Sequence, residues 1–314
     1  MNECILITAI GSMAAKTVIQ KLKDNYHVIG CDIYEKKWVA NATEVIDFYQ
    51  VPRFDDSKYL TKIIDICKLH NVKYLIPLTD YEIDVFNINR DLFLSLDITL
   101  CISSKNTIDL CRNKKDCFDY LSTFNLPSCI DTDYVKNLKE VVYPIVIKPV
   151  DGRSSQGLHF VKDSTELSEI IKQIDHDKYI YQRFYKGNIV TCDVCRDDIS
   201  NKTICVSREE LLRTYNGAGL SVRVFNDFEL NDVVCKIANI LNVRGCVNFE
   251  FIKNDDGYKF IECNPRFSGG IAFSCLAGYD FVNNSLNVFK YEDISDIISP
   301  QEMFIAKRYE EVIC

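Results

Sequence analysis

The segment GCVNFEFIKNDDGYKFIECNPRF constrains the fold most, because it is typical of two β-strands joined by a tight DDG turn. A three-residue loop at Asp255–Gly257, ending in a left-handed glycine, would pair Asn254 with Tyr258. Counting outward from that pair places Glu250 directly opposite Glu262. A slip of one residue would separate the two carboxylates, so the register of this hairpin decides what the segment can do.

The same register gives the hairpin two chemically different faces. Asn248 stands opposite Asn264 on the face that carries the glutamates. Facing carboxylates repel unless a cation lies between them, and Mg²⁺ held by carboxylates and substrate phosphates suits that position. The alternative is that both glutamates are simply solvated on an exposed face. The residues expected on the opposite, core-facing side are Phe249, Phe251, Ile261 and Cys263.

The first hundred residues alternate apolar strands with amphipathic helices. ECILIT, YHVIGCD, KYLIPL and ITLCI are typical strands, and Ala14–Lys23, Ser57–His70 and Tyr81–Leu96 have helical spacing. This order predicts a parallel sheet covered by helices. Gly11 after the first strand and Asp32 after the second would suit a nicotinamide dehydrogenase. That alternative is disfavoured because AIGSMAAK supplies only one of the three glycines required.

Beyond residue 103 the pattern changes. The stretch NTIDLCRNKKDCFDYLSTFN is helical, short strands separated by turn residues follow, and further helices are expected at Asp227–Leu241 and Ile271–Phe289. Ten of the twelve glycines lie after residue 150, so turns and close backbone approaches concentrate there. We therefore expect an α/β protein in three parts: residues 1–103, 104–180 and 181–314.

A second motif, PIVIKPVDGRSSQGLHFVK, predicts a strand that presents Lys148, a polar loop and a returning strand. Small residues in such a loop let backbone amides approach phosphate oxygens, hydroxyls add donors, and a lysine adds a fixed positive charge. The motif is no P-loop, because the lysine precedes the glycines and a hairpin replaces the helix. The alternative is a plain hairpin with a polar loop. The loop residues concerned are Gly152, Ser154, Ser155 and Gly157.

Charge and hydropathy limit the partners. The 45 acidic and 37 basic residues give a net charge of −8, which repels a phosphate backbone, so we expect no nucleic-acid partner. No apolar run approaches the roughly 18 residues of a membrane span, so we expect no membrane partner. Glu3 and Lys16 also argue against a secretory signal at the start of the sequence.

The fifteen cysteines are odd in number and scattered, which favours reduced thiols and a cytoplasmic protein. Cys192 and Cys195 form one close pair, CDVC. Positions three apart on a strand point to opposite faces, so joint metal or redox chemistry there is disfavoured.

Taken in order, these motifs resemble the ATP-grasp superfamily. They are Lys114 in CRNKKDCFDYL, Lys148 with the GRSSQG loop, the strand YIYQRF before Gly187, Glu250, and ECNPRFSGG. The nearest resemblance is to carboxylate-amine ligases similar to the large subunit of carbamoyl-phosphate synthase. The resemblance covers nearly the whole chain, and E-x-N-P-R with a second acid twelve residues upstream is its most specific part. It implies a Rossmann-like N-terminal domain followed by two ATP-grasp subdomains that enclose the nucleotide.

The resemblance also implies how ATP would be held. Two lysines would contact its phosphates, the glycine- and serine-rich loop would close over them, and the backbone of the YIYQRF strand would meet adenine. The implied nucleotide-binding residues are Lys114, Lys148, Gly152, Ser154, Ser155, Gly157, Gln182, Arg183 and Phe184.

For the chemistry, the resemblance implies that Glu250, Glu262 and Asn264 hold Mg²⁺, for which Mn²⁺ is a compatible substitute. Arg266 would neutralise the transferred phosphoryl group, as phosphoryl transfer requires. Arg208 is a weaker candidate for a substrate carboxylate or acyl phosphate, and a structural arginine is the alternative. The catalytic candidates are thus Arg266, Lys148 and Arg208.

One departure from the family pattern concerns the adenine end. The segment Gln182–Phe184 would be the hinge between the two ATP-grasp subdomains, and Gly187 follows it. Family members often carry an acid where Arg183 stands and another shortly after the glycine, where this chain has Asn188, Ile189 and Val190. Both acids would help to hold adenine or ribose, so nucleotide affinity and choice are open, and Asp193 is a candidate substitute.

We therefore expect a ligase that activates a small-molecule carboxylate with ATP and passes it to an amine. The alternatives are transfer to a non-amine acceptor, and a nucleotide sensor or accessory subunit without turnover. A homo-oligomer is left open.

Overall fold

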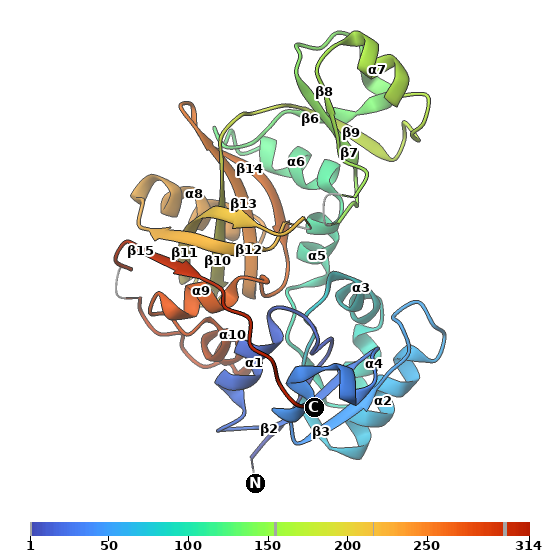
Figure 1. The fold of residues 1–314 in the computed structure, drawn as a ribbon, viewed down its shortest axis with the longest axis vertical. Coiled ribbons are helices and arrows are strands. Elements are labelled where there is room, and N and C mark those ends of the chain that lie inside the picture. The colour runs from blue at the N-terminus through green and yellow to red at the C-terminus, as the bar shows by residue number, and fades with distance from the viewer. Residues whose placement is uncertain (1, 154–155, 216, 298–299) are drawn as a thin grey trace.

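A computed structural model describes residues 2–153, 156–215, 217–297 and 300–314, whose strands form three sheets (Figure 1). The first is parallel, with the strand order β3-β2-β1-β4-β5, which confirms the expected N-terminal sheet. Its strands are β1 (Cys4–Ile7), β2 (His27–Asp32), β3 (Asp47–Gln50), β4 (Val72–Ile76) and β5 (Thr99–Leu100). The sequence analysis missed β3, an edge strand whose side chains are only partly buried or exposed.

Helices pack on this sheet because each buries one apolar face. They are α1 (Ala15–Leu22), α2 (Tyr59–Leu69), α3 (Asp80–Ile88) and α4 (Arg90–Ser95), with short 3₁₀ helices at Lys36–Trp38 and Ala40–Thr43. The prediction of a single helix over residues 81–96 is wrong, because the segment forms the two helices α3 and α4. It breaks at Asn89, whose side chain donates to the carbonyl of Val85 and so competes with the backbone ladder.

The second sheet is small and antiparallel, with the order β6-β9-β7-β8. It contains the expected hairpin around the glycine- and serine-rich loop, in which Ile145 pairs with Val161. Ser154 and Ser155 lie outside the described residues. The elements are β6 (Thr132–Tyr134), a 3₁₀ turn (Val135–Asn137), β7 (Ile145–Pro149), β8 (His159–Val161), α7 (Ser164–Ile170) and β9 (Tyr179–Arg183). The expected boundary at residue 180 falls inside β9.

The third sheet is antiparallel, with the order β14-β13-β10-β11-β12-β15. One face packs against α8, and the other packs against α9 and α10, which also join α1 in a single core. Its strands are β10 (Asn188–Arg196), β11 (Thr203–Arg213), β12 (Gly219–Phe225), β13 (Gly245–Asn254), β14 (Gly257–Asn264) and β15 (Met303–Ala306). Its helices are α8 (Phe228–Ile240), α9 (Ile271–Leu276) and α10 (Phe281–Lys290).

Two helices that the sequence predicts as continuous are interrupted. The stretch after residue 103 forms α5 (Lys105–Arg112) and α6 (Lys114–Ser122), because Asn113 is extended and its side chain caps α6. The last predicted helix divides into α9 and α10 around Gly278, whose φ is +110°. Among the helices in the described part of the chain, none is long and apolar enough to cross a bilayer.

The β13–β14 hairpin keeps the predicted register of its acids through a different turn. Asn254 pairs with Gly257, whose φ is +93°, so the loop has two residues and Lys253, not Asn254, pairs with Tyr258. A bulge then leaves Ile261 unpaired and restores Glu250 opposite Glu262.

The bulge also changes which side chains face the core. Phe260 is fully buried, and Ile261 is partly exposed and lines a cavity on the acidic face. The expectation that Ile261 faces the core is therefore wrong, whereas Phe249, Phe251 and Cys263 are buried as predicted.

The CDVC pair behaves as strand geometry predicts. Cys192 packs in the core beneath α8, and Cys195 packs in the core on the other face of β10. Burial raises the pKa of Cys192 to about 12, so its thiol is protonated at neutral pH. All fifteen cysteines lie in the described residues as free thiols.

The bulge yields a stability prediction. Phe260→Ala should lower the free energy of unfolding by about 3–5 kcal/mol, because it empties a filled core site. Ile261→Ala should cost much less, because Ile261 faces a cavity and not the core. Urea unfolding followed by circular dichroism would measure both variants, and equal losses of stability would contradict the bulge.

Candidate active site

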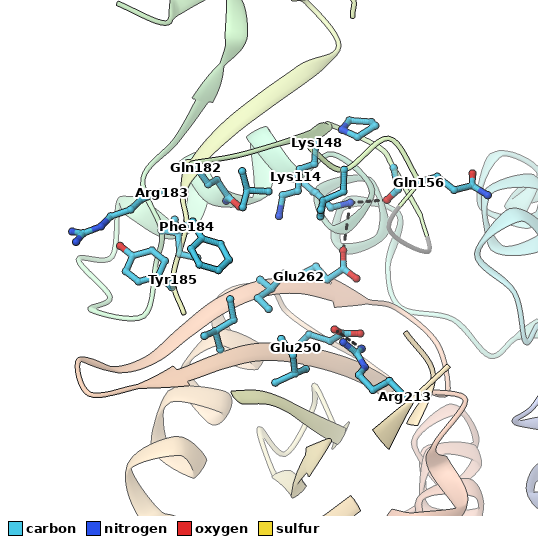
Figure 2. A pocket seen from close by; sticks show the side chains of 18 residues that line it. Lys114, Lys148, Gln156, Gln182, Arg183, Phe184, Tyr185, Arg213, Glu250 and Glu262 are labelled. Carbon is cyan, nitrogen blue, oxygen red and sulfur yellow. Dashed lines mark hydrogen bonds and ion pairs between the residues drawn. The ribbon is translucent and has the colours of Figure 1, made fainter. Parts of the chain in front are cut away.

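The largest concentration of predicted site residues surrounds a cavity of about 250 Å³ between the small sheet and the β13–β14 hairpin (Figure 2). One end is apolar and lies beside the hinge Gln182–Phe184, at the end of β9, and the other end is charged. The apolar lining includes Ile130, Val146, Phe184, Ile189, Ile252 and Ile261. The charged lining includes Lys114, Lys148, Arg213, Glu250 and Glu262.

The two lysines reach the charged end from different elements. Lys114 is the first residue of α6, so the break at Asn113 places it there, and its Nζ donates to the carbonyl of Gly152 at 2.7 Å. Lys148 is buried on β7. Burial, and then repulsion from Lys114, lowers the pKa of Lys148 to about 8. Two cations are thus held together at a place where bound phosphates would neutralise them.

The facing carboxylates lie below these lysines. Glu262 Oε2 is 3.5 Å from Lys114 Nζ. Burial acts to raise the pKa of Glu262, but Lys114 and Lys148 hold it below its usual value. The pKa of Glu250 is instead raised by burial and by Glu262. Glu262 is therefore the firmly ionised member of the pair.

Asn264 and Arg266 extend this cluster toward the N-terminal sheet. Asn264 Nδ2 donates to Glu262 Oε1 at 3.3 Å. Arg266 Nε donates to Asp80 Oδ2 at 3.0 Å. Burial acts to raise the pKa of Asp80, but Arg266, Arg112 and Arg153 together hold it below its usual value. Arg112 Nε, from α5, lies 3.1 Å from Oδ1 of Asp84, which is on α3 with Asp80. The N-terminal domain therefore supplies carboxylates that hold the basic residues of the site.

Sequence reasoning missed Asp80. The available signal is that Asp80 begins α3 directly after β4, at the carboxyl edge of a parallel sheet, where α/β proteins build their sites. The same helix reaches the glycine-rich loop. Arg153 is paired with Asp84, and its guanidinium lies 4.1 Å from the centre of the Tyr81 ring.

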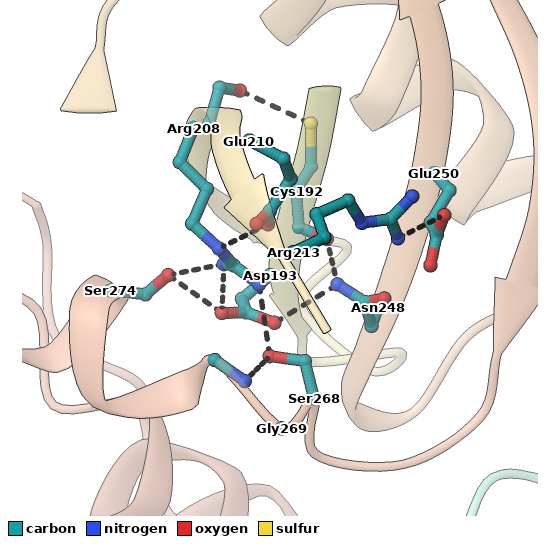
Figure 3. A network of polar contacts seen from close by, with 12 residues as sticks. Cys192, Asp193, Arg208, Glu210, Arg213, Asn248, Glu250, Ser268, Gly269 and Ser274 are labelled. Carbon is teal, nitrogen blue, oxygen red and sulfur yellow. Dashed lines mark hydrogen bonds and ion pairs between the residues drawn. The ribbon is translucent and has the colours of Figure 1, made fainter. Parts of the chain in front are cut away.

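Arg208 occupies a different environment from the predicted substrate contact (Figure 3). It is 1% exposed, and Nη1 lies 2.5 Å from Asp193 Oδ2. The guanidinium also donates to Ser268 and Ser274, and Nε donates to Glu210. Its donors are engaged by protein, which favours a positioning role for Arg208.

This network explains one of the two glycines that follow Arg266. A Cβ on Gly270 would lie 2.8 Å from Arg208 Nη2, so the turn can pack on the guanidinium only with glycine there. Asp193 is fully buried with Arg208, so it cannot replace the missing hinge acids as a partner for adenine or ribose.

Two smaller, polar cavities of about 100 Å³ each adjoin the carboxylates. The second cavity lies against the turn Ser268–Gly270, and the third is lined by Asp80, Arg112, Arg153 and Arg266 beside the two glutamates. Arg213, at the end of β11, lines both of them and the first cavity, and the sequence analysis missed it. Its Nη2 donates to Glu250 Oε2 at 3.0 Å.

Gln182, Arg183 and Phe184, which the sequence predicts to meet adenine, all line the first cavity at its apolar end. Gln182 is buried, and its side chain donates to Thr132 Oγ1 at 2.6 Å. The Arg183 side chain is exposed, and Phe184 N donates to the carbonyl of Pro144. Ile189 adds an apolar wall where the family pattern favours an acid.

A sequence profile described as "ATP-grasp domain" matches residues 111–270, which is half of the chain. The chain belongs to the ATP-grasp family. The profile "PylC-like, N-terminal domain" matches residues 5–101, the part that carries the parallel sheet.

Known proteins with similar sequence or structure agree with this assignment. The formate-dependent phosphoribosylglycinamide formyltransferase of Prochlorococcus marinus is 26% identical over 289 residues, covering 83% of this chain and 69% of the relative. The biotin carboxylase domain of a Hydrogenobacter thermophilus 2-oxoglutarate carboxylase, solved with MgADP and bicarbonate, has a TM-score of 0.75 at 17% identity. That match covers 94% of this chain and 71% of the carboxylase chain.

N5-carboxyaminoimidazole synthetase from Staphylococcus aureus, solved with ADP, also has a TM-score of 0.75, at 15% identity. The match covers 94% of this ATP-grasp chain and 80% of the synthetase. At such identities, structural likeness establishes the shared fold, namely a parallel-sheet N-terminal domain followed by the antiparallel ATP-grasp sheets.

The lysine pair of this ATP-grasp protein yields a pH prediction. As the expected phosphate ligand, Lys148 would have to be charged, and its pKa of about 8 means that its proton is lost above that pH when no phosphate is bound. The affinity for a non-hydrolysable ATP analogue should therefore be steady below about pH 7.5 and fall by up to about tenfold per unit above pH 8.

Titration calorimetry across this pH range would measure the effect. Lys148→Arg keeps its charge and should give a flatter profile. A flat profile for the unsubstituted protein would contradict the assignment of Lys148 as a phosphate ligand.

Proposed function

We propose that this ATP-grasp protein is an Mg²⁺- and ATP-dependent, ADP-forming ligase that activates a carboxylate as an acyl phosphate and couples it to an amine. The observation that carries the proposal is the facing pair Glu250 and Glu262 beneath Lys114 and Lys148 (Figure 2). This arrangement has cations for phosphates on one side and hard oxygen donors for a metal on the other.

The donor set fits magnesium. Glu250, Glu262 and Asn264 offer oxygen ligands on one face of the hairpin. In the part of the chain that the structure describes, no cluster of three or more His, Cys, Asp or Glu side chains could hold a metal alone. Mg²⁺ commonly uses one or two carboxylates and takes its other ligands from phosphates and water, and Mn²⁺ can replace it. When bound, it would offset charge on the phosphates during transfer.

The basic residues would act at the phosphoryl group. Lys114 and Lys148 would hold the phosphates. The loop from Gly152 to Gly157, which includes Ser154 and Ser155, would close over the phosphates. Arg266, held by Asp80, would face the transferred group and offset the charge that develops on it. Arg208 would keep the Ser268–Gly270 turn in place beside the reacting groups.

The reaction would proceed in two displacements. A carboxylate oxygen of the substrate attacks the terminal phosphorus, the bond to the ADP oxygen breaks, and an acyl phosphate forms. The amine nitrogen then attacks the acyl carbon, phosphate leaves with the bonding pair, and the nitrogen gives up a proton. The second cavity, beside Arg266 and the 268–270 turn, is the expected place of the substrate carboxylate.

We also infer a cytoplasmic location and small-molecule partners. Fifteen free, mostly buried thiols suit a reducing compartment. The cavities have volumes of about 100 to 250 Å³ and polar walls where they adjoin the carboxylates, which suits compact carboxylate and amine substrates. The net charge of −8 argues against nucleic acid as a partner. A homo-oligomer is compatible with this function.

One observation favours a second candidate, a nucleotide sensor without turnover. Arg183 and Ile189 stand where the family pattern favours acids, so the adenine end of the first cavity is unusually apolar. Tight ATP binding with no ADP release across a broad set of acceptors would favour the sensor. An ADP-release assay with Mg²⁺-ATP over a matrix of carboxylates and amines distinguishes the two, and mass spectrometry of the product would reveal a non-amine acceptor.

The metal assignment yields a direct test. Glu262→Gln should retain the fold and lose at least about hundredfold in ADP formation, because it removes the ionised carboxylate nearest the lysines. Glu292→Gln, at an exposed residue paired with Lys290, is the matched control and should keep full activity. Full turnover by Glu262→Gln, with circular dichroism unchanged, would reject this metal site.

A further inference from the structure

Arg213 occupies the point where the three cavities meet. It ends β11, its side chain is 26% exposed, and it lines the first, second and third cavities. Its Nη2 donates to Glu250 Oε2 at 3.0 Å, and its Nε donates to the carbonyl of Gly217 at 2.6 Å. Figure 2 shows the guanidinium directed at Glu250 from the side opposite the lysines.

Each carboxylate of the facing pair lies beside one cation. Glu262 is paired with Lys114, and Glu250 is paired with Arg213. The two cations differ in what they can do next. Lys114 lies beside Gly152 of the loop proposed to bind phosphates, whereas Arg213 occupies an oxygen of Glu250, a proposed metal ligand.

The other two arginines of the second cavity are held mainly by groups outside the proposed metal ligands. Arg208 is fixed by Asp193, Glu210 and two serines. Arg266 is fixed by Asp80 at 3.0 Å and by the Phe267 carbonyl, and its contact with Asn264 Oδ1 is longer, at 3.5 Å. Arg213 depends on Glu250 and on the Gly217 carbonyl, so it is the arginine whose charge would become available when Glu250 is engaged elsewhere.

We propose that Arg213 is the counter-ion that Glu250 exchanges for the metal, and that its freed guanidinium binds the anionic group of the substrate in the second cavity. The inference rests on the proposed function, since it requires a metal at Glu250 and Glu262. It moves the substrate contact expected at Arg208 five residues along β11. It also implies an order of binding, because the Arg213 guanidinium becomes available to the substrate anion only after the metal has bound.

The turn that follows β11 connects this exchange to the wall of the second cavity. Thr214 N donates to the Ala218 carbonyl, and Ala218 N donates to Thr214 Oγ1, so the turn is closed on itself. Gly217 has a φ of +85° and holds the Arg213 Nε through its carbonyl. Gly217 also lines the second cavity, so the Arg213 guanidinium lies between a wall of that cavity and Glu250.

The exchange can be tested without knowing the substrate. Electron paramagnetic resonance of Mn²⁺ would measure the affinity of the nucleotide-free protein for the ion at about pH 8. Arg213→Gln removes the competing cation, so it should bind Mn²⁺ about fivefold more tightly than the unsubstituted protein. A residue that merely positions Glu250 would give the opposite sign, because its loss would weaken Mn²⁺ binding.

Arg223→Gln is the matched control. Arg223 pairs with Glu209 on the same sheet, at 2.7 Å, and the side chains are 33% and 15% exposed, against 26% and 19% for Arg213 and Glu250. The control should leave Mn²⁺ affinity unchanged. For any carboxylate that supports ADP release, Arg213→Gln should also raise the KM for that carboxylate about tenfold, with the KM for ATP within about twofold.

The outcomes separate this inference from the function on which it rests. Tighter Mn²⁺ binding by Arg213→Gln, with Arg223→Gln unchanged, supports the exchange. Equal or weaker binding by Arg213→Gln overturns it and leaves the proposed ligase standing. If the unsubstituted protein binds no Mn²⁺ with or without ADP, the metal site itself fails and the inference fails with it.

Discussion

The organisation of this protein depends on two carboxylates that face each other across a hairpin. Glu250 and Glu262 would repel, and burial strengthens that repulsion, so the structure surrounds them with cations from other elements. Lys114 comes from α6, Lys148 from β7 and Arg213 from β11. Both sheets of the ATP-grasp part therefore contribute cations that offset the charges of Glu250 and Glu262. A bound metal and phosphates would take over that role, so ligand binding and the packing of these elements are electrostatically linked.

The N-terminal domain takes part in the same balance. Asp80 and Asp84 on α3 hold Arg266, Arg112 and Arg153, which come from three different segments of the ATP-grasp part. Arg153 belongs to the loop expected to close over phosphates, so that loop is tied to the N-terminal domain in this state. Arg266 is held mainly by Asp80, which lies outside the facing pair, whereas Arg213 is held by Glu250, a member of that pair. A metal at the facing pair would therefore compete directly with Arg213.

The sequence predicted the fold class and the facing acids but could not predict several local choices. Strand alternation and counting outward from an assumed three-residue turn placed Glu250 opposite Glu262, although the turn itself is shorter. They could not locate the bulge at Ile261, because a shorter turn and an added residue compensate and leave the acids in register. Asn89, Asn113 and Gly278 broke helices whose apolar spacing is continuous, since capping and backbone conformation outweigh periodicity there. Asp80 and Arg213 depend on contacts between distant segments, which a single sequence does not display.

The two ends of the first cavity differ in how much of the binding free energy they can supply. At the phosphate end, two lysines stand together at the cost of a lowered pKa for Lys148, so bound phosphates relieve repulsion as well as gaining contacts. At the adenine end, the walls are largely isoleucine and phenylalanine, which favour any flat base through burial but distinguish bases poorly. The Phe184 N–H is already bound to the Pro144 carbonyl, so the apolar walls are the main contact that this end would offer a base. Under the proposed function, the phosphates would then contribute more to nucleotide recognition than the base.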